Sequence, residues 1–339
     1  MSADGTIPLA TLGQPEGEGR AATAPPVLSI LVVSYNTREM TLDCLRSVVA
    51  ETRTPHELIV LDNASPDGSA AAIAAEFPGV RLIVSPENLG FAEGNNVAAR
   101  EARGEYLLLL NPDTLVLRGA LDRLLAFARA EPAAGIWGGR TLFPDGSLNP
   151  PSCWRRLDLW ALLMRATGLG SLFRLSPVLN AEGYGGWQRD RAAEVDIVTG
   201  CLFLIRRADW QRLGGFDPTF VMYGEEADIC RRAQKLGFRP MITPSAEIVH
   251  YAGASDTVQA EKRIRLYRAL MTLIRRHFPP WQRPLARGLL YAVPLGRVLG
   301  LSALRPLGLG RPVSRAAWGE VWDRRAEWRD GYPDRSGNG

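Results

Sequence analysis

Short apolar runs alternate with amphipathic stretches through the first part of the chain. Four apolar runs end in polar turn residues, at 27–34, 57–61, 80–84 and 106–110. Runs of this length, bounded by turn signals, are typical of buried β-strands. Between them, apolar residues at helical spacing predict helices over 38–51 and in the segments that end at Glu76 and Arg103.

This alternation predicts an α/β fold with a mostly parallel central sheet and helices on both faces. Right-handed crossovers bring the carboxyl ends of parallel strands to one edge, where open α/β sheets bind ligands. Residues 195–206 predict one more buried strand, with Thr199 and Gly200 inside it, and residues 240–250 predict a short strand that ends in His250. A glycine inside a strand indicates that another group approaches the backbone closely.

Polar residues lie at the predicted ligand-binding edge. Asp113 follows the run at 106–110, and a carboxylate there can hold a divalent cation, which in turn can hold a diphosphate. Asp62 follows an earlier strand and can accept hydrogen bonds from a base or ribose, while Asn95 and Asn96 can reach the same ligand. Asn and Asp are also common turn residues, so these side chains alone leave both interpretations open.

Three carboxylates gather at a predicted helix start, namely Glu225, Glu226 and Asp228. A helix N-terminus favours negative charge, and helix geometry places Glu225 and Asp228 on one face while Glu226 points elsewhere. Crowded carboxylates raise one another's pKa, which suits a general base. An acidic first turn that only caps the helix is the alternative interpretation.

Charge is unevenly distributed over the 339 residues. From Glu261 onward there are 16 Lys and Arg against 6 Asp and Glu, a net charge of +10, whereas the residues before it carry 24 against 30, a net charge of −6. The four cysteines are scattered, which fits a reducing compartment and argues against a disulfide framework. Residues 1–24 lack an apolar core, so they predict a disordered tail and no signal peptide.

Residues 262–315 contain 12 Lys and Arg and no Asp or Glu, interleaved with apolar and aromatic residues. Without a nucleic-acid-binding motif, this composition predicts a basic amphipathic region lying on an anionic membrane surface. Pro284 and Pro294 predict that the region is broken into short helices. Arg287 and Arg297 argue against insertion across the bilayer.

Five segments carry the most specific patterns in the chain. They are SYN at 34–36, LDNASPDGS at 61–69, ENLGFAEGNN at 87–96, LLLLNPDT at 107–114 and GGFDPTFVMYGEEADICRRAQKLGF at 214–238. Together they resemble family 2 glycosyltransferases with the GT-A fold, and in particular the rhamnosyltransferase-like branch. The resemblance covers roughly residues 27–255. With the composition of the two ends, it predicts a disordered tail at 1–24, a GT-A glycosyltransferase domain at 25–260 and a basic amphipathic helical region at 261–339.

The resemblance implies an inverting glycosyltransferase that works in cell-surface polysaccharide assembly. It implies transfer of a sugar from a nucleoside-diphosphate donor, dTDP-rhamnose or a UDP-sugar, onto a glycan or polyprenyl-linked acceptor. With the basic tail, it implies a cytoplasmic protein that is peripheral on the inner face of the cell membrane and has no nucleic-acid partner.

Two other functions stay open at this point. One is a nucleotidyltransferase acting on a sugar phosphate, which shares an α/β nucleotide-binding core. Such an enzyme needs a Gly-rich loop with basic residues after the first strand, and the segment SYNTREM at 34–40 is not such a loop. A degenerate domain that anchors partners to a membrane is favoured only by Asn111, which replaces a carboxylate of the family.

The resemblance also implies roles for individual residues. Binding of the nucleotide sugar is implied for Tyr35, Asn36, Asp62, Asn88, Asn95, Asn96, Asn111, Asp113, Thr199 and Gly200. Asn111 stands at the first carboxylate of the family's D-x-D motif, which leaves Asp113 as the carboxylate ligand of Mg²⁺ or Mn²⁺, with His250 completing the metal shell. Glu226 is implied as the catalytic base, and Glu225 and Asp228 as support for the base or the acceptor.

Residues 150–190 mix aromatic and basic side chains, among them Trp154, Arg155 and Arg156. The part from 160 to 173 is mostly apolar. Core packing is one interpretation of this segment, and a flap that touches the acceptor or the bilayer is the other.

Overall fold

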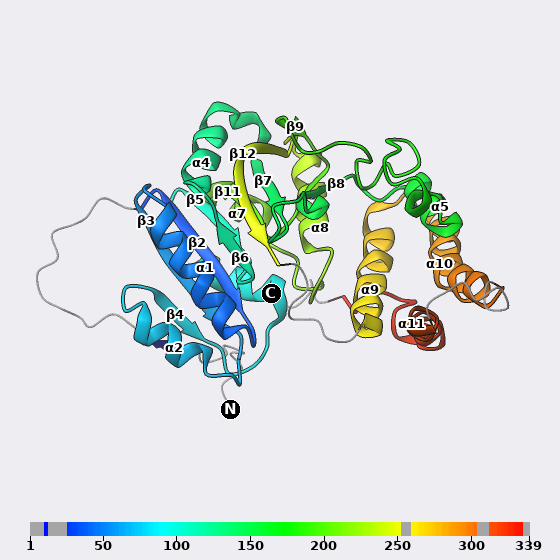
Figure 1. Cartoon of the computed structure of the whole chain (residues 1–339), viewed down its shortest axis with the longest axis horizontal. Helices are drawn as coiled ribbons and strands as arrows, with labels where there is room; N and C mark the ends of the chain where they lie inside the picture. Colours follow the sequence, from blue (N-terminus) through cyan, green and yellow to red (C-terminus); the bar gives the residue numbers. More distant parts are fainter. Residues whose placement is uncertain (1–9, 13–25, 252–258, 304–311, 335–339) are drawn as a thin grey trace, which may run out of the picture.

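The computed structural model describes residues 10–12, 26–251, 259–303 and 312–334. A central sheet has helices on both of its faces, and a group of C-terminal helices stands beside this α/β body (Figure 1). Most of the predicted tail at 1–24 lies outside the described residues. Its residues 10–12 form a short strand at one edge of the sheet.

Twelve strands form one large sheet and one small one in the described chain. They are β1 (Ala10–Leu12), β2 (Leu28–Ser34), β3 (His56–Asp62), β4 (Arg81–Val84), β5 (Tyr106–Leu110), β6 (Thr114–Val116), β7 (Ile136–Leu142), β8 (Cys153–Trp154), β9 (Ala193–Glu194), β10 (Ile197–Val198), β11 (Leu202–Arg206) and β12 (Met241–His250). The large sheet has the order β1-β4-β3-β2-β5-β11-β7-β12-β6, with β9 on β12. Its segment β4-β3-β2-β5 is parallel, as predicted, whereas β11 is antiparallel to both neighbours.

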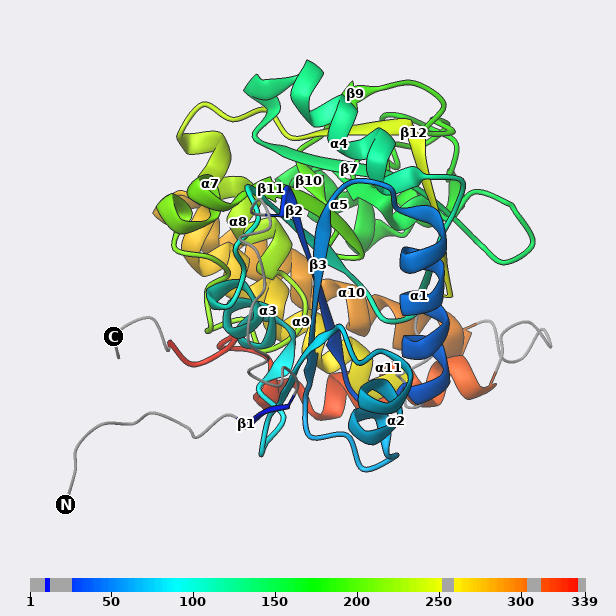
Figure 2. The ribbon, with the colours of Figure 1, turned by 90° about the vertical axis from the view of Figure 1, so that its left-hand side faces the viewer.

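Helices cover both faces of the large sheet (Figure 2). The α-helices of the described chain are α1 (Arg38–Glu51), α2 (Ser69–Glu76), α3 (Gly90–Arg100), α4 (Ala120–Ala130), α5 (Leu159–Thr167), α6 (Leu169–Leu172), α7 (Arg207–Leu213), α8 (Glu225–Lys235), α9 (Gln259–His277), α10 (Arg283–Ala303) and α11 (Pro312–Asp323). Successive side chains of a strand point to opposite faces. Val32 of β2 therefore joins the core under Leu45 of α1, while Leu31 joins the core under Val97 of α3. A slip by one residue would exchange the two sets, so the buried runs determine the register.

The prediction of one continuous strand over 195–206 is wrong. The chain forms β10 and β11 with a turn between them, because Val198 pairs with Cys153 in the small sheet while Leu202 pairs with Leu110 in the large one. Gly200 lies in this turn, and a Cβ on it would come within 3.1 Å of the Phe91 ring. The predicted close approach at this glycine is therefore confirmed, although it occurs in a turn and not inside a strand.

The C-terminal region forms longer helices than its prolines predict. The prediction that Pro284 and Pro294 break it into short pieces is wrong, since α10 is 21 residues long and contains both. Pro284 lies in the first turn, where a missing N–H costs nothing. Pro294 lies inside the helix, whose buried residues, such as Leu290, pack in a shared core with Ile274 of α9 and Leu162 of α5. No helix in the described ranges is both long and apolar enough to cross a bilayer.

Candidate active site

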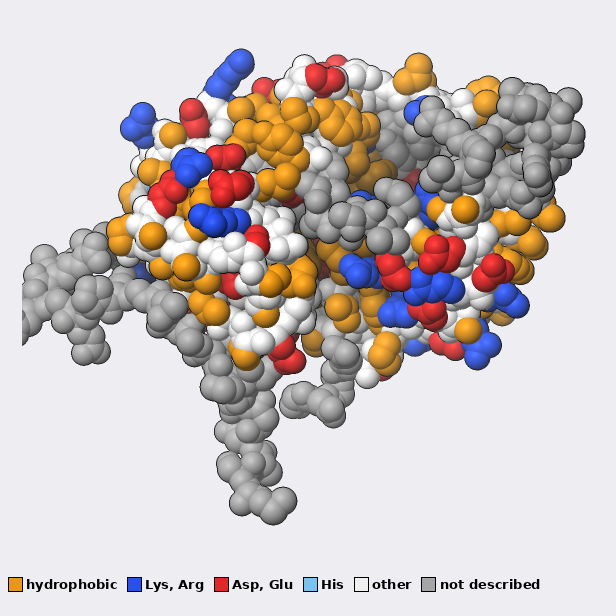
Figure 3. Space-filling model, turned by 60° about the horizontal axis from the view of Figure 1, so that its bottom comes forward, with side chains coloured by type: hydrophobic (Ala, Val, Ile, Leu, Met, Phe, Trp, Pro, Cys, Tyr) orange, Lys and Arg blue, Asp and Glu red, His pale blue; other side chains and the backbone are white. Residues whose placement is uncertain are grey.

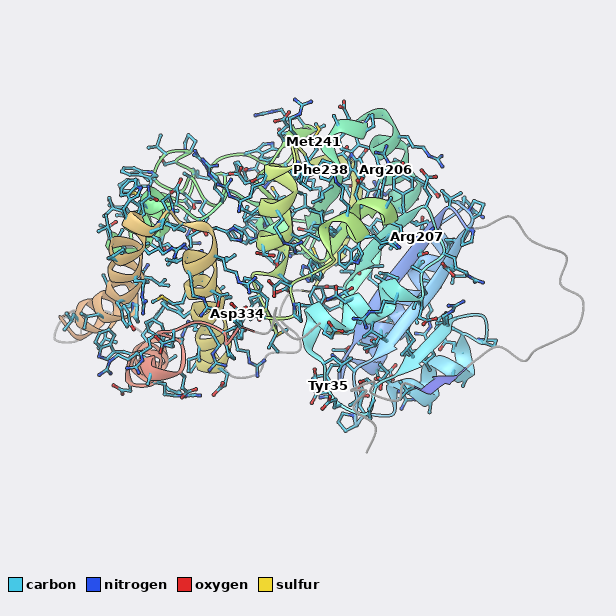
Figure 4. The ribbon with its side chains drawn as sticks, turned by 180° about the vertical axis from the view of Figure 1, so that it is seen from behind. Tyr35, Arg206, Arg207, Phe238, Met241 and Asp334 are labelled. Carbon is cyan, nitrogen blue, oxygen red and sulfur yellow. The ribbon has the colours of Figure 1, made fainter. Side chains whose placement is uncertain are left out.

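The carboxyl ends of the parallel strands open into a cavity of about 1360 Å³. Figure 4 shows Tyr35, which follows β2, at one end of the sheet, and Arg206, Phe238 and Met241 at the opposite end. Nine of the predicted site residues line the cavity, and they are Tyr35, Asn88, Asn111, Asp113, Thr199, Gly200, Glu225, Glu226 and His250. The predicted edge therefore brings most of these side chains around one space.

The side chains of Asp113 and His250 contact each other at this edge of the sheet. Strand β12 runs antiparallel to β6, which places His250 opposite Thr114 and its Nε2 at 3.3 Å from Asp113 Oδ1. Burial opposes protonation of the imidazole, but Cys201 and the Asp113 carboxylate outweigh it and raise the pKa of His250 to about 10. Asn111 is next to them, and its buried Oδ1 has no hydrogen-bond partner among the described residues.

These three side chains fit a hard divalent cation. A carboxylate, an amide oxygen and an imidazole are ligands that Mg²⁺ or Mn²⁺ accepts. No group of three or more His, Cys, Asp or Glu residues suited to a metal occurs among the described residues. A cation here would therefore need the otherwise unpaired Asn111 Oδ1, together with oxygen atoms from a ligand or water.

Asp62 and Asn36 are not among the residues that line the cavity. Asp62 is buried at the end of β3, where Oδ2 accepts a hydrogen bond from the Ser65 N–H at 3.1 Å, and its Oδ1 has no partner in the described chain. The Asn36 N–H donates to Ser65 Oγ at 3.0 Å. Asn63, which we did not predict, does line the cavity and donates through Nδ2 to Asn88 Oδ1 at 3.0 Å. The only signal in the sequence for Asn63 as a site residue is that it is polar and lies next to Asp62.

The structure does not bring Asn95 and Asn96 to the cavity. Asn95 Nδ2 donates to the Phe91 carbonyl at 2.9 Å, within its own helix α3. Asn96 accepts from the Phe216 N–H and donates to the Phe216 carbonyl, each at 2.9 Å. Asn96 therefore joins α3 to the chain before α8, whereas Asn95 is engaged within α3.

Glu225 and Glu226 line the cavity at the N-terminus of α8. Gly224 precedes them with φ of 91°, a left-handed conformation that favours glycine and that starts the helix abruptly. Burial raises the pKa of both carboxyl groups, and the neighbouring charge of Glu226 raises that of Glu225 further. Two buried carboxyl groups side by side therefore favour holding a proton, and Oε2 of each has no hydrogen-bond partner among the described residues.

Asp228 has a different role from the other two carboxylates. It is buried, and its oxygens contact Arg232 Nε at 2.7 Å and His277 Nε2 at 2.8 Å. Burial works against ionisation, but His277 and Arg232 outweigh it and hold the pKa of Asp228 below its usual range. His277, at the end of α9, lines the cavity and was not predicted. Nothing in the local pattern around residue 277 indicates a partner 49 residues earlier.

We expect Asp228→Asn to lower the free energy of unfolding by roughly 3–5 kcal/mol, because one partner of a buried ion pair is removed. Urea unfolding at neutral pH measures this change. Since the folded-state pKa is lowered, the stabilisation is present above the unfolded-state pKa and is lost as pH falls through the folded-state pKa. Asp43→Asn, which removes an exposed ion pair to Arg46, is the control and should change little. Equal effects of the two variants would contradict a buried network at Asp228.

A family model decides what kind of protein this geometry belongs to. The model described as glycosyl transferase family 2 matches residues 29–213, which is more than half of the chain. The chain belongs to glycosyl transferase family 2. This family 2 glycosyltransferase is 29% identical over 276 residues to N-acetylglucosaminyl-diphospho-decaprenol L-rhamnosyltransferase of Mycobacterium tuberculosis, covering 76% of this chain and 88% of that protein.

Two further comparisons support the same assignment. Rhamnosyltransferase WbbL of Escherichia coli is 27% identical to the family 2 chain, over 66% of this chain and 83% of that protein. The solved mannosyltransferase PcManGT of Pyrobaculum calidifontis, in complex with GDP-Man and Mn²⁺, superposes with a TM-score of 0.52 at 20% identity, covering 92% of this chain and 88% of that chain. The predicted GT-A fold and rhamnosyltransferase-like family are thus confirmed.

Proposed function

We propose that this glycosyltransferase moves rhamnose from dTDP-rhamnose, or a sugar from a UDP-sugar, onto a glycan or polyprenyl-linked acceptor in cell-surface polysaccharide assembly. The observation that carries the proposal is the opening of two polar pairs, Asp113 with His250 and Glu225 with Glu226, into one cavity. The first pair suits a nucleoside-diphosphate donor, and the second suits an acceptor hydroxyl. The names of two similar proteins, both rhamnosyltransferases, support the choice of sugar.

Different residues of the chain carry out different parts of the reaction. Asp113, His250 and Asn111 would hold Mg²⁺ or Mn²⁺, which offsets the negative charge of the departing diphosphate. Glu226 takes the proton of the acceptor hydroxyl while that oxygen bonds to the anomeric carbon and the bond to the diphosphate breaks. Glu225, whose pKa is raised well above its ordinary value by burial and by the charge of Glu226, keeps its proton beside the base. This single displacement inverts the anomeric centre.

Donor turnover with defined nucleotide sugars tests the proposal. We expect release of dTDP or UDP with Mn²⁺ or Mg²⁺ present, and an inverted glycosidic linkage in the product by NMR. Release of pyrophosphate from a nucleoside triphosphate and a sugar phosphate would instead indicate nucleotidyl transfer. No turnover of any nucleotide sugar would support a binding domain without activity.

We further propose that the protein binds the inner face of the cell membrane through α10. Leu285, Leu295 and Leu299 of α10 and Trp281, in the short 3-10 helix before it, are exposed and recur at spacings that place them on one helical face. Arg283, Arg287 and Arg297 add positive charge to α10, but each is two positions from one of these residues and so lies on another side of the helix, and Arg287 contacts Asp330 at 3.6 Å. An exposed apolar face on a helix with basic residues and no acidic ones suits an anionic lipid surface.

Many other basic residues of the region are already paired. On the face in Figure 3, Lys and Arg side chains at the right are interleaved with Asp and Glu side chains. Arg324 contacts Glu261, Glu320 and Glu327, and Arg276 contacts Asp217. The attraction to lipid therefore comes from fewer charges than the 16 Lys and Arg from Glu261 onward, and the apolar face of α10 contributes more.

The full-length protein should co-sediment with anionic vesicles but not with neutral ones at low salt. High salt should release most of it, since exposed charges are screened within about a Debye length. Replacing Trp281 and Leu285 together by Glu should abolish binding, because charge is placed on the apolar face. Val49→Glu, an exposed apolar position on α1, is the matched control and should bind normally. Wild-type protein that ignores anionic vesicles would contradict the proposal.

A further inference from the structure

A group of positively charged side chains also lines the cavity. Arg155, Arg156 and Arg231, which we call the arginine wall, line it together with Glu226 and Asp113. Arg155 and Arg156 follow β8 and are exposed, and Arg231 lies on α8. This part of the cavity has no role in the donor chemistry described above.

No carboxylate pairs with the arginine wall in the described chain, because the acidic side chains nearby are already engaged. Glu182 forms two hydrogen bonds with Arg165, at 2.6 and 2.5 Å. Asp196 accepts from the backbone N–H of Arg156 at 3.0 Å and from Gln234 Nε2 at 3.3 Å. Three guanidinium groups therefore line one cavity, and none of them forms an ion pair with a carboxylate of the described residues.

Contacts among β8, β10 and α8 fix the backbone that carries the arginine wall relative to Glu226. The pairing of β8 with β10, at Trp154 and Ile197, places Arg155 and Arg156 beside the strand that α8 packs on. Gln234 of α8 donates to the Asp196 carbonyl at 3.0 Å and ties the helix to this segment. Arg231 is five residues beyond Glu226, which corresponds to about 7.5 Å along the helix axis. A sugar ring can lie between the base and the arginine wall.

Apolar side chains also line the cavity, among them Leu266, Leu273 and Phe278 of α9 and the turn after it. The cavity thus offers a general base, a group of arginines and apolar surface. A molecule that carries a hydroxylated sugar, an anionic link and a hydrocarbon chain matches these three kinds of lining.

We propose that Arg155, Arg156 and Arg231 bind the phosphate or diphosphate group of the acceptor, separately from the donor's diphosphate at Asp113. Arginine suits this role because its planar fork can bond two phosphate oxygens at once. The inference rests on the proposed function, since it assumes that the acceptor hydroxyl meets Glu226. It adds that the acceptor is recognised by its anionic link and not by its sugar alone.

Binding of inorganic pyrophosphate tests the arginine wall without any assumption about the sugar. Titration in EDTA keeps metal out of the Asp113 site. We expect the double variant Arg155→Ala, Arg156→Ala to bind pyrophosphate about tenfold or more weakly, because one hydrogen bond to a charged group is worth roughly that factor. Arg231→Ala should weaken binding in the same direction, and lysine at 155 and 156 should restore part of it.

Two controls accompany this titration. Arg129→Ala removes an exposed arginine of α4, far along the chain from the site, and should bind pyrophosphate as the wild type does. Asp113→Ala should also keep its affinity for metal-free pyrophosphate, which separates this site from the donor site. Absence of binding to the wild type, or equal binding by the double variant, would overturn the proposal.

Kinetics then connect the arginine wall to the acceptor. In detergent free of anionic lipid, we compare N-acetylglucosaminyl diphosphate on a short alkyl chain with the alkyl N-acetylglucosaminide that lacks phosphate. The double variant should raise KM for the first by tenfold or more and for the second by much less. Equal losses with both acceptors would overturn the inference while leaving glycosyl transfer intact. Because no lipid headgroup is present, membrane binding cannot produce this difference.

Discussion

Glu226→Gln should lower the kcat of sugar transfer by about 10²–10⁴-fold, which is the usual contribution of a general base. The amide has the shape of the carboxylate but cannot accept the proton of the acceptor hydroxyl. Donor affinity should change little, because Asp113 and His250 come from β5, β6 and β12 and not from α8. Single-turnover transfer and isothermal titration with the nucleoside diphosphate measure the two effects separately.

The two neighbouring carboxylates provide the controls. Glu225→Gln keeps a hydrogen-bond donor toward Glu226, so it should reduce transfer less than Glu226→Gln does. Asp228→Asn should act mainly on stability, because that carboxylate is occupied by Arg232 and His277. A larger loss of transfer in either control variant would mean that the base is assigned to the wrong residue of the cluster.

The pH profile of transfer gives a second readout of the same residue. Burial raises the pKa of Glu226, so the acidic limb of kcat/KM should lie above the ordinary range of a glutamate. Activity is lost as pH falls, because the base becomes protonated. The effect on stability has the opposite sign, since a raised folded-state pKa favours folding at low pH and this contribution is lost as pH rises through that pKa. Glu226→Gln should remove the acidic limb.

Asp113→Ala should abolish metal-dependent hydrolysis of the donor while the protein stays folded. Asp113 is the only carboxylate of the candidate metal shell, and the remaining ligands, the His250 imidazole and the Asn111 amide, are neutral when they bind a metal. Without it, the shell cannot balance the charge of the cation. Release of nucleoside diphosphate against Mn²⁺ concentration measures the loss, and thermal unfolding checks the fold.

Asp209→Ala, in the first turn of α7, is the matched control and should hydrolyse donor at the wild-type rate. His250→Ala should keep some activity but require more metal, because the carboxylate remains. Wild-type turnover that persists undiminished in EDTA would contradict a metal at Asp113.

The sequence by itself determined the parallel part of the sheet and the ends of its strands. Strands β2 to β5 are apolar runs with an abrupt polar end, and this pattern depends only on neighbouring residues. Asp113 could be predicted at the ligand-binding edge for that reason, since a strand end in a parallel sheet has only one edge to reach. The acidic start of α8 is also local, because three carboxylates within four residues are visible without knowing what packs on them.

Only the tertiary structure decided which of these carboxylates is free to accept a proton. Helix periodicity places Asp228 and Glu226 on different faces but does not tell which of them is already engaged; His277 of α9 contacts Asp228 at 2.8 Å and occupies it. The division of residues 195–206 into two strands has the same origin, because two different sheets offer partners for its two halves. Partners far away in the chain leave no periodic signal, so their effects appear only when the chain has folded.

Packing likewise decided which helices the basic C-terminal region forms. Composition correctly indicated amphipathic helices, but α10 continues through Pro294 because its buried face packs against α9 and α5. Arg155 and Arg156 stand out in the sequence only as two basic residues in an irregular segment. Their position along one cavity with Glu226 depends on β8 pairing with β10, a contact between segments about forty residues apart. Charge can be counted from the sequence, but which charges remain unpaired depends on the contacts made in the folded protein.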